Sequence, residues 1–118
     1  MQLIPDTNLL IYLAKYKILD ELNSYDLIVP RRVIEELVYL SKDRETKMDD
    51  RTSAVVALGF LKNRKIKIIK QRGHTDDIII DVAKKYKIAI ATMDKELSIR
   101  ANKASIEVIK LRQKKYLK

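Results

Sequence analysis

Residues 88–94 read Ile-Ala-Ile-Ala-Thr-Met-Asp, and this stretch decides the fold. Its first five residues lack the alternation of polar and apolar side chains that a half-exposed strand shows. Such a run predicts a strand buried on both faces, as in the parallel sheet of an α/β protein. The run ends at Thr92, and Asp94 follows after one residue. The stretch therefore places a carboxylate at the end of a central strand.

Apolar runs and helical spacing alternate on both sides of this stretch. Further strands are expected at residues 2–5, 26–29, 66–69 and 107–110. Helices are expected at 8–16, 31–41, 51–62, 77–86 and 95–101, with a shorter helical piece at 18–22 and an exposed loop at 42–50. Thr75 or Asp76 is a candidate cap for the helix at 77–86. The alternation predicts a parallel sheet between two layers of helices, a Rossmann-like three-layer α/β/α sandwich.

Composition limits the class of protein. The chain has 118 residues, of which 47% are hydrophobic, so we expect one domain over residues 1–118 with a basic C-terminal tail at 110–118. No run reaches the roughly 18 apolar residues of a membrane span, and the start lacks the pattern of a signal peptide, so a cytoplasmic protein is expected. There is no cysteine, and His74 is the single histidine. Oxygen atoms are therefore the expected metal ligands.

The net charge of +9 suits a polyanionic partner. A lysine-rich solvated surface, as in many thermophilic proteins, would give the same balance. Only two glycines are present, so a glycine-rich phosphate loop is not expected.

Acidic residues fall where a site is expected. In a parallel α/β sheet the site lies beyond the carboxyl ends of the strands, near the point where strand order reverses. Asp6 directly follows a strand, and Asp94 follows another after one residue. Residues 76–77 open a helix, and Glu36 lies on a further helix. Grouped carboxylates repel one another unless a cation compensates them, and Mg²⁺ or Mn²⁺ prefers oxygen ligands. The pattern predicts metal-dependent phosphodiester hydrolysis, the reaction of a nuclease.

Each acid also has an ordinary explanation. Asp6 or Asp94 could cap a helix, and one of Asp76 and Asp77 is expected to do so. Asp77 is preferred as a ligand because it directly precedes an apolar run, and Asp76 is the alternative. Of the adjacent acids at 35–36, only one can face inward, and Glu36 is preferred.

Four motifs resemble those of the PIN-domain ribonucleases in order and spacing. They are Asp6-Thr7-Asn8, Glu36-Leu37, the Asp76-Asp77 pair before three isoleucines, and Ala-Thr-Met-Asp-Lys-Glu-Leu at 91–97. The resemblance covers the whole chain. It implies a PIN-like fold and divalent-metal-dependent endonucleolytic cleavage of RNA.

The resemblance also implies roles for individual residues. The catalytic acids would be Asp6, Glu36, Asp77 and Asp94, of which Asp6, Asp77 and Asp94 would bind the metal. Orientation of carboxylates or water would fall to Thr7, Asn8, Asp76 and Thr92. Contacts with single-stranded or looped RNA are expected from Arg31, Arg32, Lys95, Arg112, Lys114 and Lys115.

Two subfamilies fit, and RNA processing of the ribosomal RNA maturation type is preferred. The motifs around 75–78 and 91–97 resemble PIN nucleases that mature small-subunit ribosomal RNA, whereas the small size also suits VapC-type toxins, which would pair with an antitoxin. Apolar positions on the helices at 8–16 and 31–41 allow a homodimer. A catalytically silent RNA-binding module is an alternative on the same fold. A phosphoryl-transfer protein is a further alternative, but no Asp-x-Asp motif supports it.

Overall fold

The computed structural model describes residues 1–112 and 116–117. In these residues a central sheet has five parallel strands in the order β3-β2-β1-β4-β5. The strands are β1 (Gln2–Pro5), β2 (Asp26–Pro30), β3 (Lys67–Ile69), β4 (Ala89–Ala91) and β5 (Val108–Ile109).

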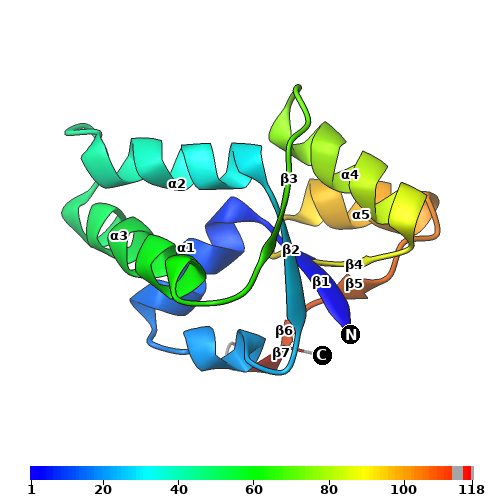
Figure 1. The fold of residues 1–118 in the computed structure, drawn as a ribbon, viewed down its shortest axis with the longest axis horizontal. Coiled ribbons are helices and arrows are strands. Elements are labelled where there is room, and N and C mark those ends of the chain that lie inside the picture. The colour runs from blue at the N-terminus through cyan, green and yellow to red at the C-terminus, as the bar shows by residue number, and fades with distance from the viewer. Residues whose placement is uncertain (113–115, 118) are drawn as a thin grey trace.

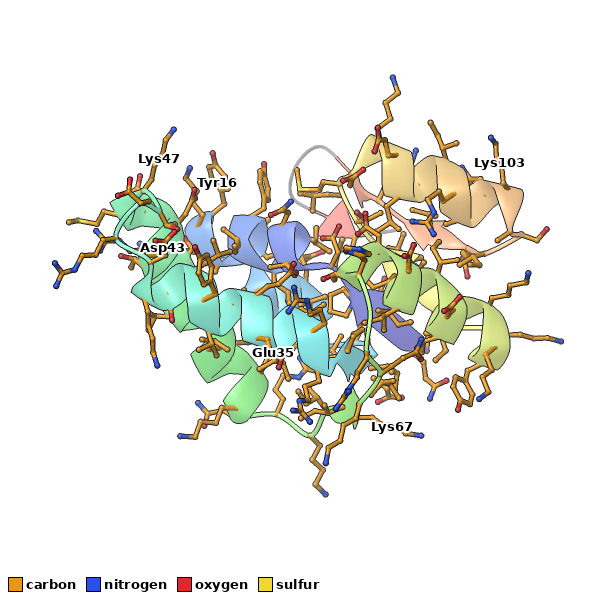
Figure 2. The ribbon with its side chains drawn as sticks, turned by 90° about the horizontal axis from the view of Figure 1, so that it is seen from above. Tyr16, Glu35, Asp43, Lys47, Lys67 and Lys103 are labelled. Atoms are coloured by element: carbon orange, nitrogen blue, oxygen red, sulfur yellow. The ribbon has the colours of Figure 1, made fainter. Side chains whose placement is uncertain are left out.

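Helices cover the sheet in two groups. They are α1 (Thr7–Lys15), the 3₁₀ helix η1 (Leu19–Leu22), α2 (Arg31–Lys42), α3 (Met48–Lys62), α4 (Thr75–Tyr86) and α5 (Lys95–Lys103). In both Figure 1 and Figure 2, α1, α2 and α3 lie to one side of the sheet and α4 and α5 to the other. The predicted α/β/α sandwich is confirmed. In the part of the chain that the structure describes, no helix is long and apolar enough to cross a membrane.

Strand order reverses next to β1. The chain adds β2 and then β3 on one side of β1, and then β4 and β5 on the other side. Leu3 is in register with Leu27 of β2 and with Ala89 of β4. The carboxyl ends of β1 and β4 therefore flank the reversal point, where α/β sheets place their ligands.

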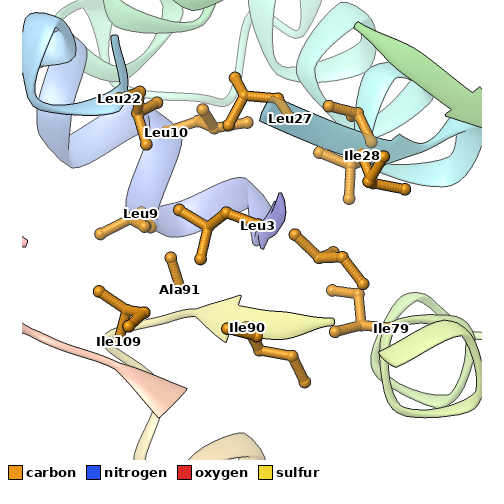
Figure 3. Packing of buried hydrophobic residues seen from close by; sticks show 14 of the residues in the cluster. Leu3, Leu9, Leu10, Leu22, Leu27, Ile28, Ile79, Ile90, Ala91 and Ile109 are labelled. Carbon is orange, nitrogen blue, oxygen red and sulfur yellow. The ribbon is translucent and has the colours of Figure 1, made fainter. Parts of the chain in front are cut away.

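The core fixes these strand ends in place. Leu3 of β1, Ile90 of β4, Leu9 of α1 and Ile79 of α4 are fully buried, and Figure 3 shows their side chains in one cluster. Burial of each such side chain contributes about 1.5–3 kcal/mol. All three residues of β4 are buried, as the uninterrupted apolar run predicts. The helix at 8–16 turns its leucines into this core, so these leucines are not available for a contact between copies, and the homodimer stays a prediction.

Two helix starts differ from the prediction. α3 begins at Met48, inside the expected loop at 42–50, because Asp49 and Asp50 stabilise the positive end of the helix in its first turn. Neither Thr75 nor Asp76 caps α4: both lie inside it, and His74 is the N-cap, without a side-chain hydrogen bond. The helix starts early because the chain turns at Gly73, whose φ of 131° is favourable only for glycine.

The C-terminal segment folds back where it is described. β6 (Leu111–Arg112) pairs antiparallel with β7 (Tyr116–Leu117). The Leu117 side chain is buried, its N–H donates to Glu21 Oε1 at 3.3 Å, and its carbonyl accepts from the Tyr25 hydroxyl at 3.5 Å. In Figure 1 this hairpin lies at the opposite end of the molecule from α2 and α4. Lys114 and Lys115 lie outside the described residues, so their contact with RNA stays a prediction.

Candidate active site

A cavity of about 560 Å³ opens beyond the carboxyl ends of β1 and β4. We call it the acidic cavity because five carboxylates line it: Asp6, Glu35, Glu36, Asp76 and Asp94. Thr7, Asn8, Arg32, Tyr39, Leu40 and Thr75 complete its wall. Four segments far apart in the sequence therefore meet at the predicted edge of the sheet.

Asp6 is the most buried of these acids, with 6% of the residue exposed. It caps α1, because its Oδ1 accepts a hydrogen bond from the N–H of Leu9 at 2.8 Å. Its Oδ2 accepts a hydrogen bond from the hydroxyl of Thr92. Both carboxylate oxygens are thus held, which fixes the orientation of the side chain.

Burial raises the pKa of Asp6 from 3.8 to about 6. The hydrogen bonds from Thr92 and Leu9 act against this rise, and the negative charges of Asp76 and Asp94 add to it. The ionised form of Asp6 is therefore less favoured than that of an ordinary aspartate. This is expected where carboxylates lie close together in a partly buried site.

Thr92 connects two of the acids. While its hydroxyl donates to Asp6, its Oγ1 accepts from the N–H of Asp94 at 2.9 Å. Asp94 in turn caps α5, since its Oδ1 accepts from the N–H of Leu97 at 3.0 Å. The end of β1 and the start of α5 are thereby held in a fixed relation.

Glu36 reaches the cavity from α2. Its Oε1 accepts a hydrogen bond from the hydroxyl of Thr7 at 2.5 Å. Thr7 is buried and Glu36 is half-buried, so this bond holds the carboxylate against the wall. The neighbouring Asn8 also lines the cavity.

The acidic pair at the start of α4 divides between two environments. Asp76 lines the cavity, and desolvation raises its pKa, with a further rise from the charges of Asp94 and Glu36. Asp77 does not line the cavity. Its Oδ1 accepts from Arg100 at 2.8 Å in a half-exposed ion pair. The structure thus groups Asp76, the alternative candidate, with the other acids in place of the preferred Asp77.

Three helix N-termini meet at this cavity. Asp6 caps α1, Asp94 caps α5, and Asp76 lies in the first turn of α4. The first N–H groups of a helix lack partners within it and carry a partial positive charge. These ends stabilise carboxylates that otherwise repel one another.

The donor set fits a hard divalent cation, because carboxylate oxygens are the ligands that Mg²⁺ and Mn²⁺ prefer. Burial raises the pKa of both Asp6 and Asp76, and the negative charges of neighbouring acids raise them further, which a bound cation would counteract. Among the described residues, however, no three acidic or histidine side chains already form a set of ligands around one point.

Some of the predicted RNA-binding residues line the acidic cavity and others do not. Arg32 lines the acidic cavity, whereas Lys95, the first residue of α5, does not. Glu35, the acid beside the preferred Glu36, is half-exposed at the rim, 3.9 Å from both Arg31 and Arg32. Tyr39, Leu40 and Thr75 line the cavity but were not predicted as site residues. Helical spacing could have indicated the first two, since positions three and four beyond Glu36 share its face.

Comparison with known proteins identifies the family. The family described as "PIN like domain" matches residues 3–114. The chain belongs to this family. The PIN domain here is 33% identical to Ribonuclease VapC4 of Methanocaldococcus jannaschii, over 98% of this chain and 93% of the relative.

Two solved structures share the fold of this PIN domain. A domain of a functionally unknown protein from M. jannaschii DSM 2661 has a TM-score of 0.66 at 19% identity, covering 94% of this chain and 91% of the other. A PilT N-terminus domain protein from the hyperthermophilic archaeon Sulfolobus solfataricus P2 has a TM-score of 0.59 at 11% identity, covering 97% and 90%. At these identities the likeness supports the fold alone.

Proposed function

We propose that this PIN domain is a divalent-metal-dependent endoribonuclease. The observation that carries the proposal is the grouping of Asp6, Glu36, Asp76 and Asp94 in one cavity at the reversal point of the sheet. The similarity to a protein named a ribonuclease supports RNA as the substrate. The site's oxygen-only donors support a magnesium or manganese ion.

In this proposal Asp6, Asp76 and Asp94 hold the cation, with Asp76 taking the place first expected for Asp77. A bound cation would supply positive charge to offset the charge that develops on the phosphate. Thr92 and the N–H of Leu9 hold the Asp6 carboxylate in one orientation. Only the side chains of Asp76 and Asp94 would therefore need to adjust around it.

Glu36 is the proposed general base. Thr7 occupies its Oε1, which leaves Oε2 to accept a proton from the attacking water. The water oxygen forms a bond to phosphorus as the bond from phosphorus to the leaving ribose oxygen breaks. That oxygen takes its proton from solvent. Tyr39, 65% exposed at the cavity wall, offers a surface on which a base could stack.

The test is cleavage of a mixed-structure RNA with Mn²⁺, Mg²⁺ or EDTA. Cutting should require the metal and should be lost in Asp6→Asn and Asp94→Asn, whereas RNA binding should persist. Asp26→Asn is the matched control, because Asp26 is exposed at the amino end of β2. Cutting in EDTA or full activity of Asp6→Asn would overturn the proposal. RNA binding without metal-dependent cutting would identify the silent module instead.

The biological role has two candidates. The 33% identity to Ribonuclease VapC4 favours a VapC-type toxin with an antitoxin partner over the ribosomal RNA maturation that the motifs suggest. Induced expression in a bacterial host separates them. A toxin should arrest growth, and Asp6→Asn should not. Accumulation of cleaved small-subunit precursor RNA without growth arrest would favour maturation.

A further inference from the structure

A second cavity, of about 310 Å³, adjoins the acidic cavity. We call it the basic cavity; its wall consists of Arg31, Arg32, Glu35, Lys70, Gln71, Arg72 and Gly73. Arg32 and Glu35 line both cavities, so the two are neighbours along the first half of α2. The loop between β3 and α4 forms the opposite wall.

The two cavities carry opposite charge. Four cations and one carboxylate line the basic cavity, whereas five carboxylates and one arginine line the acidic cavity. Glu35 lies 3.9 Å from both Arg31 and Arg32, and pairs this long and this exposed contribute little. Among the described residues, no ion pair involves Lys70 or Arg72. The cavity thus keeps most of its positive charge available.

The shape and donors of the basic cavity suit a phosphodiester. Guanidinium groups bind phosphate oxygens through paired N–H donors, and lysine adds a compact positive charge. The first turn of α2 also begins there, and no side-chain hydrogen bond caps this helix. Its positive end therefore adds to the charge of the side chains.

We propose that the basic cavity binds a backbone phosphate of the RNA strand beside the bond cut in the acidic cavity. This inference rests on the proposed nuclease function and assigns a direction to the substrate path, along α2. Arg32 and Glu36 are one helical turn apart, about 6 Å along the axis, which is of the order of one nucleotide step in an extended strand. Lys70 and Arg72, which no motif indicated, become RNA contacts.

The test compares two double variants with equal loss of charge. Lys70→Gln with Arg72→Gln neutralises the basic cavity. Lys47→Gln with Lys103→Gln removes two exposed cations elsewhere, and Figure 2 shows these two lysines toward opposite ends of the molecule. Both pairs are made in the Asp6→Asn background, so binding of a fluorescein-labelled single-stranded RNA of mixed sequence is measured without cleavage. Thermal melts check that both fold.

The basic-cavity pair should bind RNA about tenfold more weakly at low salt, because charged hydrogen bonds are lost. It should also lower the slope of log Kd against log salt by about 0.7 for the lost phosphate contact. The Lys47 and Lys103 pair should change both much less. Equal losses in the two pairs would overturn the inference, and this holds whether or not the wild-type protein cleaves RNA.

Cleavage locates the phosphate. Substrates carrying one neutral methylphosphonate near the mapped cut are compared for wild type and for the basic-cavity pair with Asp6 restored. A methylphosphonate at one position should slow cleavage by the wild type but cause no further slowing in the variant. The reason is that the neutral linkage and the protein substitutions remove the same contact. Independent, additive losses at every position would overturn the assignment. Absence of any wild-type cleavage would instead contradict the proposed function.

Discussion

The hydroxyl of Thr92 donates to Oδ2 of Asp6 across 86 positions of sequence. Both residues are buried, at the ends of the two strands that flank the reversal point. The same Thr92 oxygen accepts from the N–H of Asp94. One buried hydroxyl thus sets the relation between two acids of the candidate site.

Replacing Thr92 with Val keeps the side-chain shape but removes this hydroxyl. The carboxylate of Asp6 and the N–H of Asp94 then each lose a partner. We expect a loss of about 1–3 kcal/mol in the free energy of unfolding at pH 8, measured by urea denaturation in EDTA. Thr92→Ser keeps the hydroxyl and is the control. Equal stability of the two variants would contradict this role.

The stability of the metal-free protein should depend on pH through Asp6. Its pKa is about 6 in the folded protein and 3.8 without burial, so the folded state holds the proton more tightly. The contribution of this proton binding to the free energy of unfolding is complete below pH 3.8 and is lost as pH rises through about 6. The difference between the two pKa values corresponds to about 3 kcal/mol.

Asp6→Asn carries no such penalty, and asparagine caps helices as well as aspartate. In EDTA the variant should therefore gain stability over the wild type between pH 4 and 7, and the gain should vanish in acid. Urea denaturation across this pH range measures it. A difference that does not change with pH would show that burial does not disfavour the ionised form of Asp6.

Asp76 and Asp77 should differ sharply in their effect on RNA cleavage. Asp76→Asn should lower the rate by about a hundredfold or more, because it removes a carboxylate from the acidic cavity. Asp77→Asn should have a small effect, since it breaks only a half-exposed pair with Arg100 that is worth less than about 1 kcal/mol. Single-turnover cleavage separates the two, and the reverse order would restore Asp77 as the ligand.

The C-terminal hairpin should stabilise the fold through Leu117. Leu117→Ala should lower the free energy of unfolding by about 2 kcal/mol, because a buried side chain is truncated. Chemical denaturation measures the loss. Unchanged stability of Leu117→Ala would show that the hairpin does not matter for folding.

Deleting the C-terminal tail would therefore change folding and RNA binding together. Lys114→Gln with Lys115→Gln tests the effect of the tail's charge on RNA binding alone.

The sequence was sufficient to predict where the strands end but not how every helix is rotated. Asp6 and Asp94 were found because each lies just beyond the end of a strand, and the parallel topology brings strand ends together. Glu36 was preferred because it precedes Leu37 in the pair that resembles a PIN-domain motif, and its helix begins at Arg31 as expected. Asp6 and Asp94 also cap helices, a role that was considered as an alternative to a place in the site. In the structure both acids cap a helix and line the cavity.

The structure places Asp76 and not Asp77 at the acidic cavity for a geometric reason. α4 begins at Thr75, two residues before the expected start. Each residue turns a helix by about 100°, so neighbouring acids point in quite different directions. The spacing of apolar residues in the sequence does not fix the rotation of the helix to within one residue. Lys70 and Arg72 escaped notice for a related reason: loop residues follow no period, so only the folded chain shows what they face.

The capping roles of Asp6 and Asp94 bear on how such a protein could change over evolution. Each acid holds a helix end through an oxygen that asparagine also has. Two substitutions, each replacing one oxygen atom by an amide nitrogen, would remove both negative charges and leave the helix starts and the hydrophobic core in place. Under the proposed function, descendants that fold and bind RNA but no longer cut it are therefore two substitutions away.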